Sequence, residues 1–174
     1  LLAYDLGTGG NKASLYDAEG RLLADAFVPY ATHYPQAGWH EQRPLDWWNA
    51  VVESARQLLQ TSGVNKEEIG GLGMSGHSLG AVPIGRNGEL LRDTPPIWSD
   101  TRAQAEVEEF FTRVDPATWY ITTGNGFPAA LYTVFKVMWY RKHEPEMFHK
   151  VHRILGTKDY INFKLTGEIK TDFS

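Results

Sequence analysis

A glycine-rich turn between two short apolar segments constrains the fold of this chain more than any other feature of its first residues. A strand is predicted to end just after Asp5, a tight turn follows at Gly7-Thr8-Gly9-Gly10, and a second strand is predicted from Asn11. Small residues in succession let the backbone approach a ligand closely and adopt positive φ. Because a strand follows the turn where a helix would be needed, the pattern argues against a dinucleotide-binding fingerprint and against a P-loop.

Two interpretations of this turn stay open from the segment alone. Successive backbone N–H groups in such a turn can bind an anion. Asp5 would repel a bare phosphate, but Mg²⁺ with its waters can bridge a carboxylate and a phosphate. The functional interpretation is therefore a nucleotide-phosphate turn with a metal-directing Asp5. A glycine-rich β-hairpin with a solvated Asp5 accounts for the same residues equally well.

Composition limits the classes of partner. The 174 residues suffice for one domain with a core, and the net charge of −4 comes with lysines and arginines that are spread singly, which argues against nucleic-acid binding. The absence of cysteine excludes disulfides, thiolate metal sites and a cysteine nucleophile. No apolar run approaches the ~20 residues of a membrane span, and no signal-peptide pattern occurs. We therefore expect a cytoplasmic protein that binds neither membrane nor nucleic acid, and a homodimer stays open.

The spacing of apolar residues and turn signals predicts the order of the elements. Strands are expected over 1–6, 11–16 and 21–28 as an antiparallel meander, then a helix over Pro44–Gln60 that Ser62-Gly63 ends. Further along, we expect strands over 69–75 and 81–84, a hairpin turn at Asn87-Gly88 and a strand from Ile97. A helix over Thr101–Val114, a short helical turn through Trp119 and a loop over 122–128 are expected next. The last predicted elements are a helix through Arg141, a strand over 151–155 and a helix over Thr157–Thr166 that ends at Gly167.

Polar residues follow two of these predicted strands. Ligands collect where the strands of open α/β sheets end, so His77, Ser78, Asp100 and Arg102 are candidate ligand contacts. In the alternative interpretation, Asp100 caps the next helix and Arg102 pairs with a nearby glutamate. From the pattern alone, this second interpretation is favoured.

Several short strings, spread over nearly the whole chain, together resemble the N-terminal half of the FGGY family of carbohydrate kinases. Singly they are weak, but they occur in the family's order, and among its members the xylulokinases are the nearest. The strings are Asp5-Leu6-Gly7-Thr8-Gly9-Gly10-x-Lys12, Gly38-Trp39-x-Glu41-Gln42-x-Pro44-x-Asp46-Trp47-Trp48, Ile97-Trp98-Ser99-Asp100-Thr101-Arg102, Lys136-x-x-Trp139, His143-Glu144-Pro145-Glu146, and Lys158-Asp159-Tyr160 through Thr166-Gly167-Glu168.

The resemblance implies an α/β, ribonuclease H-like domain of the actin and sugar-kinase superfamily, with a mixed sheet flanked by helices. It implies that residues 1–174 are the N-terminal domain of a longer kinase. ATP and Mg²⁺ would be the cofactors and a small sugar the substrate, with the catalytic base and the adenine pocket in a C-terminal domain that this chain lacks. The ATP phosphates and Mg²⁺ would lie near Asp5, Gly7, Thr8, Gly9 and Lys12, and the sugar near His77, Ser78, Leu79, Asp100 and Arg102.

One departure from the family pattern bears on the substrate. The segment Gly76-His77-Ser78-Leu79-Gly80 is similar to a segment that reads Gly-Gln-Met-His-Gly in the xylulokinases. Leu79 stands where that pattern has a histidine, so an alkyl group replaces an imidazole. Sites that bind a hydroxyl discriminate strongly because their polar groups must be paired. Xylulose, another pentulose, a polyol or a related sugar are all open as substrates. A non-catalytic sugar- or nucleotide-binding module, and an actin-like or chaperone ATPase, are the rival hypotheses.

Overall fold

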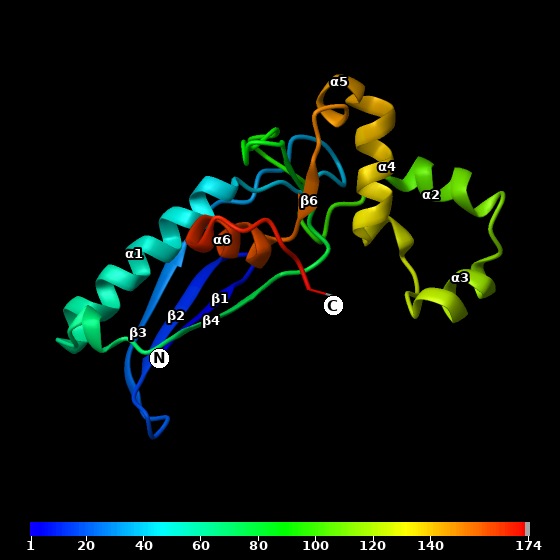
Figure 1. Ribbon diagram of the computed structural model, residues 1–174. Coiled ribbons are helices and arrows are strands. Elements are labelled where there is room, and N and C mark those ends of the chain that lie inside the picture. Colours follow the sequence, from blue (N-terminus) through cyan, green and yellow to red (C-terminus); the bar gives the residue numbers. More distant parts are fainter. Residues whose placement is uncertain (173–174) are drawn as a thin grey trace. The chain divides into compact units, whose positions relative to one another are not determined.

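The computed structural model describes residues 1–172, which divide into two compact units. The first unit contains Leu1–Thr32, Gln42–His77 and the described part of Gly156–Ser174; the second contains His33–Glu41 and Ser78–Leu155. The predicted α/β fold is confirmed: a mixed sheet flanked by helices (Figure 1).

The first unit is built on a four-stranded sheet in the order β3-β2-β1-β4. The strands are β1 (Leu2–Leu6), β2 (Gly10–Tyr16), β3 (Leu22–Pro29) and β4 (Leu72–Gly76). β1 pairs antiparallel with β2 and parallel with β4, and β2 pairs antiparallel with β3. The predicted meander is therefore confirmed, and β4 extends it into a mixed sheet.

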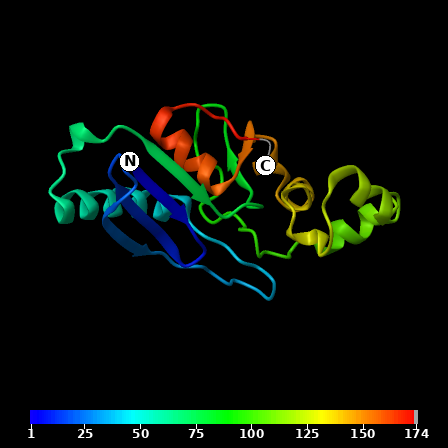
Figure 2. The same cartoon turned by 90° about the horizontal axis from the view of Figure 1, so that it is seen from below.

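Two helices pack on the sheet of the first unit. α1 (Pro44–Ser62) contacts β2 and β3, and α6 (Thr157–Thr166) contacts β4 and α1. Figures 1 and 2 both show α1 running along the sheet. Both helices end where the sequence predicts, at Gly63 and Gly167, which adopt positive φ and donate their N–H to the preceding turn. A short 3-10 turn, η1 (Lys66–Glu68), leads into β4.

The alternation of side chains in β1 decides what each face of the sheet presents. Leu2, Tyr4 and Leu6 are buried, whereas Asp5 is exposed. Because successive side chains of a strand point to opposite faces, burying the three apolar residues places Asp5 on the face opposite to the core. Lys12 lies directly across from Asp5 in the β1–β2 register, on the same face.

The second unit has a small two-stranded sheet and several helices. β5 (Val82–Ile84) pairs antiparallel with β6 (Arg153–Leu155). The helical segments are α2 (Gln104–Phe111), α3 (Pro116–Thr123), η2 (Ala129–Leu131), α4 (Thr133–His143) and α5 (Pro145–Phe148). The core between them consists of Ala81, Ala103, Val107, Ala129, Ala130, Phe135, Trp139 and Tyr140.

Three predicted boundaries in this second unit are wrong. Ile97 does not begin a strand, because residues 97–103 form turns, and the next helix runs over Gln104–Phe111 in place of Thr101–Val114. The cause is local: the Asp100 carboxylate accepts hydrogen bonds from the Arg102 backbone N–H and side chain, which holds the segment in a turn. The predicted loop over 122–128 starts later, since α3 continues to Thr123.

Candidate functional site

The glycine-rich turn joins β1 to β2, and two side chains hold its carbonyl groups. The Tyr30 hydroxyl donates to the Gly7 carbonyl at 2.6 Å, and Gln42 Nε2 donates to the Thr8 carbonyl at 2.7 Å. The Gly7 N–H closes the turn by donating to the Gly10 carbonyl at 3.0 Å. The conformation of the turn is thus held by residues distant in sequence.

These contacts determine the direction of the amide groups. In a planar trans peptide the C=O and the following N–H point in opposite directions. Because the carbonyls of Gly7 and Thr8 face Tyr30 and Gln42, the N–H groups of Thr8 and Gly9 face the other way. Successive backbone amides of such a turn can bind an anion, which is the role that the sequence predicts here.

Asp5 stands beside this turn with an accessible carboxylate. Its side chain is 53% exposed, and its Oδ2 lies 3.9 Å from the Nζ of Lys12, whose side chain is 71% exposed. An ion pair so open to water contributes little to stability. Burial and the negative charge of Asp5 raise the pKa of Tyr30, so its hydroxyl stays a neutral donor to the turn at physiological pH. The Asp5 oxygens are therefore not committed to a structural contact of any strength.

His77 belongs to the same unit and is linked to the turn through Gln42. Its Nε2 lies 3.2 Å from Gln42 Oε1, and its Nδ1 lies 3.0 Å from the hydroxyl of Thr157. An amide oxygen can only accept, so His77 Nε2 is the donor in its contact with Gln42. Trp47 Nε1 also donates to Gln42 Oε1 at 2.9 Å. Gln42 thereby connects His77, the buried Trp47 and the glycine-rich turn.

The second unit holds Asp100 and Arg102 in a buried cluster of charges. Both side chains are fully buried, and Arg102 Nη2 lies 2.8 Å from Asp100 Oδ2 and 2.7 Å from Glu41 Oε1. Arg92 Nη2 binds the same Glu41 oxygen at 2.9 Å, and the Arg102 guanidinium lies 3.9 Å from the centre of the Trp39 ring. The pairing of Arg102 with a glutamate, which the second interpretation expected, is present.

Asp100 does not cap the following helix, contrary to that interpretation. The N-cap residue of α2 is Ala103, and it makes no capping hydrogen bond through its side chain. The oxygens of Asp100 accept instead from the backbone N–H groups of His40, at 2.7 Å, and Arg102, at 3.0 Å, and from the Arg102 guanidinium. The carboxylate therefore joins the His33–Glu41 segment to the turn that precedes α2.

Glu41 is held as an anion by this cluster. Burial acts to raise the pKa of its carboxyl group, but hydrogen bonds from Thr94, Arg102 and Arg92 outweigh burial and lower the pKa below its ordinary value. Arg92 also bonds to Glu144. Three carboxylates, those of Glu41, Asp100 and Glu144, consequently share one network with two guanidinium groups.

Lys136 is a further buried charge of the second unit. Its Nζ donates to the carbonyls of Leu79 at 2.9 Å, Trp98 at 3.4 Å and Leu131. Burial lowers the pKa of Lys136 to about 7, with the negative charge of Asp100 acting against burial and the positive charge of Arg102 acting with it. The sequence indicated Lys136 only as part of a family string, because a lysine within a helix usually faces solvent.

Leu79 and Ser78 occupy an unusual stretch of backbone next to this lysine. Leu79 has φ of 62°, the one positive value among the non-glycine residues that the structure describes. Ser78 is exposed and Leu79 is half-buried. Two groups of predicted site residues therefore emerge. Asp5, Gly7, Thr8, Gly9, Lys12 and His77 lie in the first unit, and Ser78, Leu79, Asp100 and Arg102 lie in the second.

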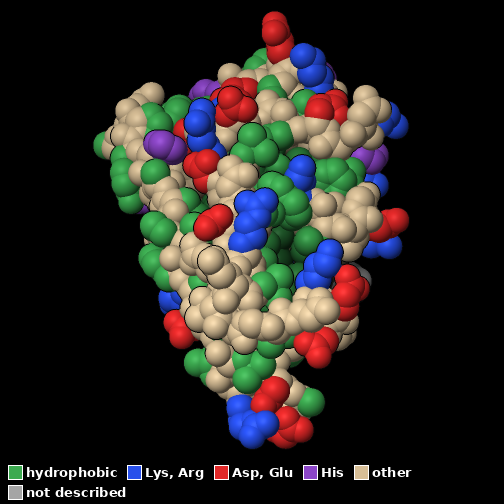
Figure 3. All heavy atoms as spheres, turned by 90° about the vertical axis from the view of Figure 1, so that its left-hand side faces the viewer, with side chains coloured by type: hydrophobic (Ala, Val, Ile, Leu, Met, Phe, Trp, Pro, Cys, Tyr) green, Lys and Arg blue, Asp and Glu red, His purple; other side chains and the backbone are tan. Residues whose placement is uncertain are grey.

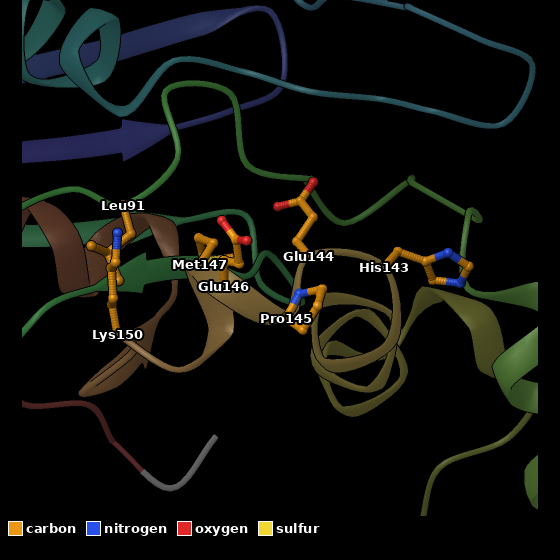
Figure 4. A pocket seen from close by; sticks show the side chains of 7 residues that line it. All are labelled: Leu91, His143, Glu144, Pro145, Glu146, Met147 and Lys150. Carbon is orange, nitrogen blue, oxygen red and sulfur yellow. The ribbon is translucent and has the colours of Figure 1, made fainter.

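A surface pocket of about 560 Å³ lies in the second unit. Its lining consists of Leu91, His143, Glu144, Pro145, Glu146, Met147 and Lys150 (Figure 4). His143 stacks on Trp139 and its Nε2 lies 3.0 Å from Glu106 Oε1, so this histidine is engaged by its own unit. No group of three or more His, Asp or Glu side chains among residues 1–172 is placed to hold a metal ion.

Charges do not gather into one patch on the face that Figure 3 shows. Lysine and arginine side chains alternate there with acidic and apolar side chains. Within the part of the chain that the structure describes, no helix is long and apolar enough to cross a membrane.

Comparison with known proteins gives the family. Residues 1–174 match the N-terminal domain of the FGGY family of carbohydrate kinases over their full length. The chain belongs to this family. It is 30% identical over 174 residues to a xylulose kinase of Bacillus subtilis, covering 100% of this chain and 34% of that protein. It is 32% identical over 170 residues to an L-xylulose/3-keto-L-gulonate kinase of Escherichia coli, covering 95% of this chain and 33% of that protein.

The fold agrees with the solved structures of FGGY kinases. A crystal structure described as that of a xyloylose kinase from Brucella ovis superposes with a TM-score of 0.88 and 32% identity, covering 96% of this chain and 34% of that one. The chain thus spans about a third of the length of the relatives it matches. The resemblance inferred from the short strings is confirmed at the level of the family.

Proposed function

We propose that this FGGY chain is the N-terminal domain of an ATP-dependent sugar kinase, which transfers the γ-phosphoryl group of ATP to a hydroxyl of a small sugar. A pentulose such as xylulose is the substrate class that we infer, and the cytoplasm the location. The observation that carries the proposal is the glycine-rich turn, whose Gly7 and Thr8 carbonyls are held by Tyr30 and Gln42 beside the accessible carboxylate of Asp5.

The donor set of this turn suits the cofactors. Mg²⁺ keeps several waters and is bound by one or two carboxylates together with substrate phosphates, and a single half-exposed aspartate beside a glycine-rich turn fits that description. When bound, Mg²⁺ would supply neutralisation of phosphate charge. Asp5 would hold the ion directly or through water, and the amides of Thr8 and Gly9 would hold phosphate oxygens, with Lys12 adding positive charge.

Phosphoryl transfer depends mainly on positioning and on neutralising charge, so the protein's part is to hold both substrates in line. We assign orientation of the sugar to the segments that carry His77, Ser78, Leu79 and Asp100. The carboxyl group of Asp100 is occupied by Arg102 and by the His40 amide, so its part in that role is to fix the backbone around it. The group that accepts the hydroxyl proton would lie outside this chain, in the C-terminal domain.

A coupled ADP assay of the full-length protein tests the proposal, with a panel of pentuloses, hexuloses and polyols. We expect sugar-dependent ADP release with at least one member of the panel and none with ATP alone. If no sugar stimulates turnover, the kinase proposal fails.

The rival function is a non-catalytic binding module, and Leu79 is the observation that favours it, since an alkyl group replaces an imidazole that could bind a hydroxyl. Calorimetry separates the two functions. A sugar that binds the full-length protein without supporting ATP turnover would favour the module.

A further inference from the structure

The Lys136 ammonium connects three segments of the second unit. The lysine lies on α4, has a fully buried side chain, and donates to the carbonyls of Leu79, Trp98 and Leu131. An ammonium group has three N–H donors, and here each has its own backbone carbonyl. One side chain therefore satisfies three acceptors that lie 57, 38 and 5 positions away.

The three carbonyls belong to the segments that carry the predicted sugar contacts of this unit. Leu79 follows Ser78 in the loop after β4, and Trp98 lies two residues before Asp100 in the turn that precedes α2. Leu131 ends η2, and α4 begins two residues later at Thr133. The Trp98 side chain is 40% exposed and Leu79 is half-buried, so lysine bonds to their backbones leave both side chains partly accessible.

Leu79 depends on such a contact more than its neighbours do. A left-handed conformation costs a residue with a Cβ roughly 1–2 kcal/mol, and it persists only where the surroundings hold it. The hydrogen bond from Lys136 to the Leu79 carbonyl is 2.9 Å long, and its donor is charged below pH 7, where the amine is protonated, which makes it one of the stronger kinds there. It therefore stabilises the backbone conformation that sets the direction of the Leu79 side chain.

The two charged groups that act on Lys136 belong to the same turn. Asp100 attracts the ammonium and Arg102 repels it, while these two residues are bound to each other. The Trp98–Arg102 turn thus contacts Lys136 through its backbone and interacts with it through its charges.

We propose that Lys136 is a positioning residue for the sugar: it fixes the Leu79 loop, the Trp98 turn and the end of η2 relative to one another, and so determines sugar affinity and selectivity without touching ATP. The predicted effect on sugar affinity and selectivity rests on the proposed kinase function. The connection between the three segments can be measured without that function.

The test uses the full-length protein with Lys136→Met, which keeps the length of the side chain but donates nothing. Losing a charged hydrogen-bond donor at the three segments should raise KM for the preferred sugar by about tenfold or more, with KM for ATP changed less than about twofold. Lys136→Arg retains charge and donors, and should recover part of the sugar affinity.

Tyr140→Phe is the matched control. Tyr140 lies one turn further along α4, is fully buried, and its hydroxyl donates to the Ala81 carbonyl at 2.8 Å. Removing the Tyr140 hydroxyl deletes a buried hydrogen bond from a side chain to a backbone carbonyl and lowers the stability of the protein. It should leave KM for the sugar unchanged. If Lys136→Met and Tyr140→Phe change KM for the sugar equally, or if KM for ATP rises as much as KM for the sugar, the inference is overturned.

Hydrogen exchange measured by mass spectrometry separates this inference from the proposed function. In Lys136→Met, peptides that cover 78–81 and 97–102 should exchange faster than in the wild type, whereas in Tyr140→Phe the 97–102 peptide should not. Unchanged exchange overturns the inference whether or not the protein phosphorylates sugars. Absence of turnover in the wild type, with faster exchange in Lys136→Met, would refute the kinase function and retain the connection between the segments.

Discussion

Glu41 and Arg102 form a buried ion pair across 61 positions of the sequence, with Arg102 Nη2 2.7 Å from Glu41 Oε1. Their side chains are 5% and 0% exposed, and Arg92 binds the same carboxylate oxygen. Buried charges in such a network depend on every partner, because removing one leaves the others desolvated and unpaired.

Arg102→Met should therefore destabilise the protein strongly. It would leave Asp100 with no cation on its carboxylate and Glu41 with Arg92 alone, and breaking a buried pair costs about 3–5 kcal/mol. Urea unfolding measures the change in the free energy of unfolding. Arg21→Met is the control, since Arg21 pairs with Asp17 at 2.7 Å but is 75% exposed, and we expect a loss below about 1 kcal/mol. Equal losses for the two variants would contradict the proposed importance of the buried network.

Lys136 should make stability depend on pH. Its pKa is lowered to about 7 in the folded protein, below the ordinary value of 10.5, so between these values the unfolded chain holds a proton that the folded protein has released. Stability rises with pH wherever the unfolded state binds more protons, by at most about 1.4 kcal/mol per pH unit for one group. The unfolding free energy of the wild type, relative to Lys136→Met, should therefore increase from pH 7 to pH 9.5.

Urea unfolding of both proteins at pH 6, 7, 8, 9 and 9.5 checks this prediction. Below pH 7 the difference between the two should level off, because the lysine is then protonated in both states. A difference that stays flat, or that falls as the pH rises, would show that the Lys136 amine is no less basic in the folded protein than in the unfolded chain.

Asp5→Ala tests the phosphate turn. The carboxylate is 53% exposed and its ion pair with Lys12 is open to water, so its removal should leave the melting temperature nearly unchanged. In the full-length protein, turnover should fall by at least about two orders of magnitude, because a metal-directing group acts on the transferring phosphoryl group. Asp25→Ala removes an exposed carboxylate from β3 of the same sheet and should have no effect on turnover. Near-normal activity of Asp5→Ala would refute the metal role.

Local signals predicted much of the fold. The glycine-rich turn, Pro44 at the start of α1, and Gly63 and Gly167 at helix ends act through the backbone of neighbouring residues, so the sequence is enough to place them. The strand expected from Ile97 does not form. Hydrogen bonds between Asp100 and Arg102 fix a turn there, and apolar spacing carries no information about them.

The buried network could not be predicted in this way. Lys136 is fully buried because carbonyls from Leu79 and Trp98, far along the chain, surround its ammonium, and no local pattern records that. Arg102 likewise binds a glutamate 61 positions away. The sequence predicted that Arg102 pairs with a glutamate but could not predict which one. Tyr30 and Gln42, which hold the carbonyls of the glycine-rich turn, were not recognised for the same reason.

Leu79→His tests which feature sets the sugar selectivity of the full-length protein. The variant introduces the histidine that the xylulokinase pattern has where this chain has Leu79. Histidine is among the residues found more often at positive φ, so the backbone conformation at φ of 62° should persist. One added hydrogen bond to a sugar hydroxyl contributes about 1 kcal/mol, and kcat/KM for xylulose relative to the other sugars of the panel should rise about fivefold. Leu79→Met, which adds no donor, should not produce this gain. If both variants change kcat/KM equally for every sugar, the side chain at position 79 affects packing alone, and selectivity among sugars must arise elsewhere in the full-length protein.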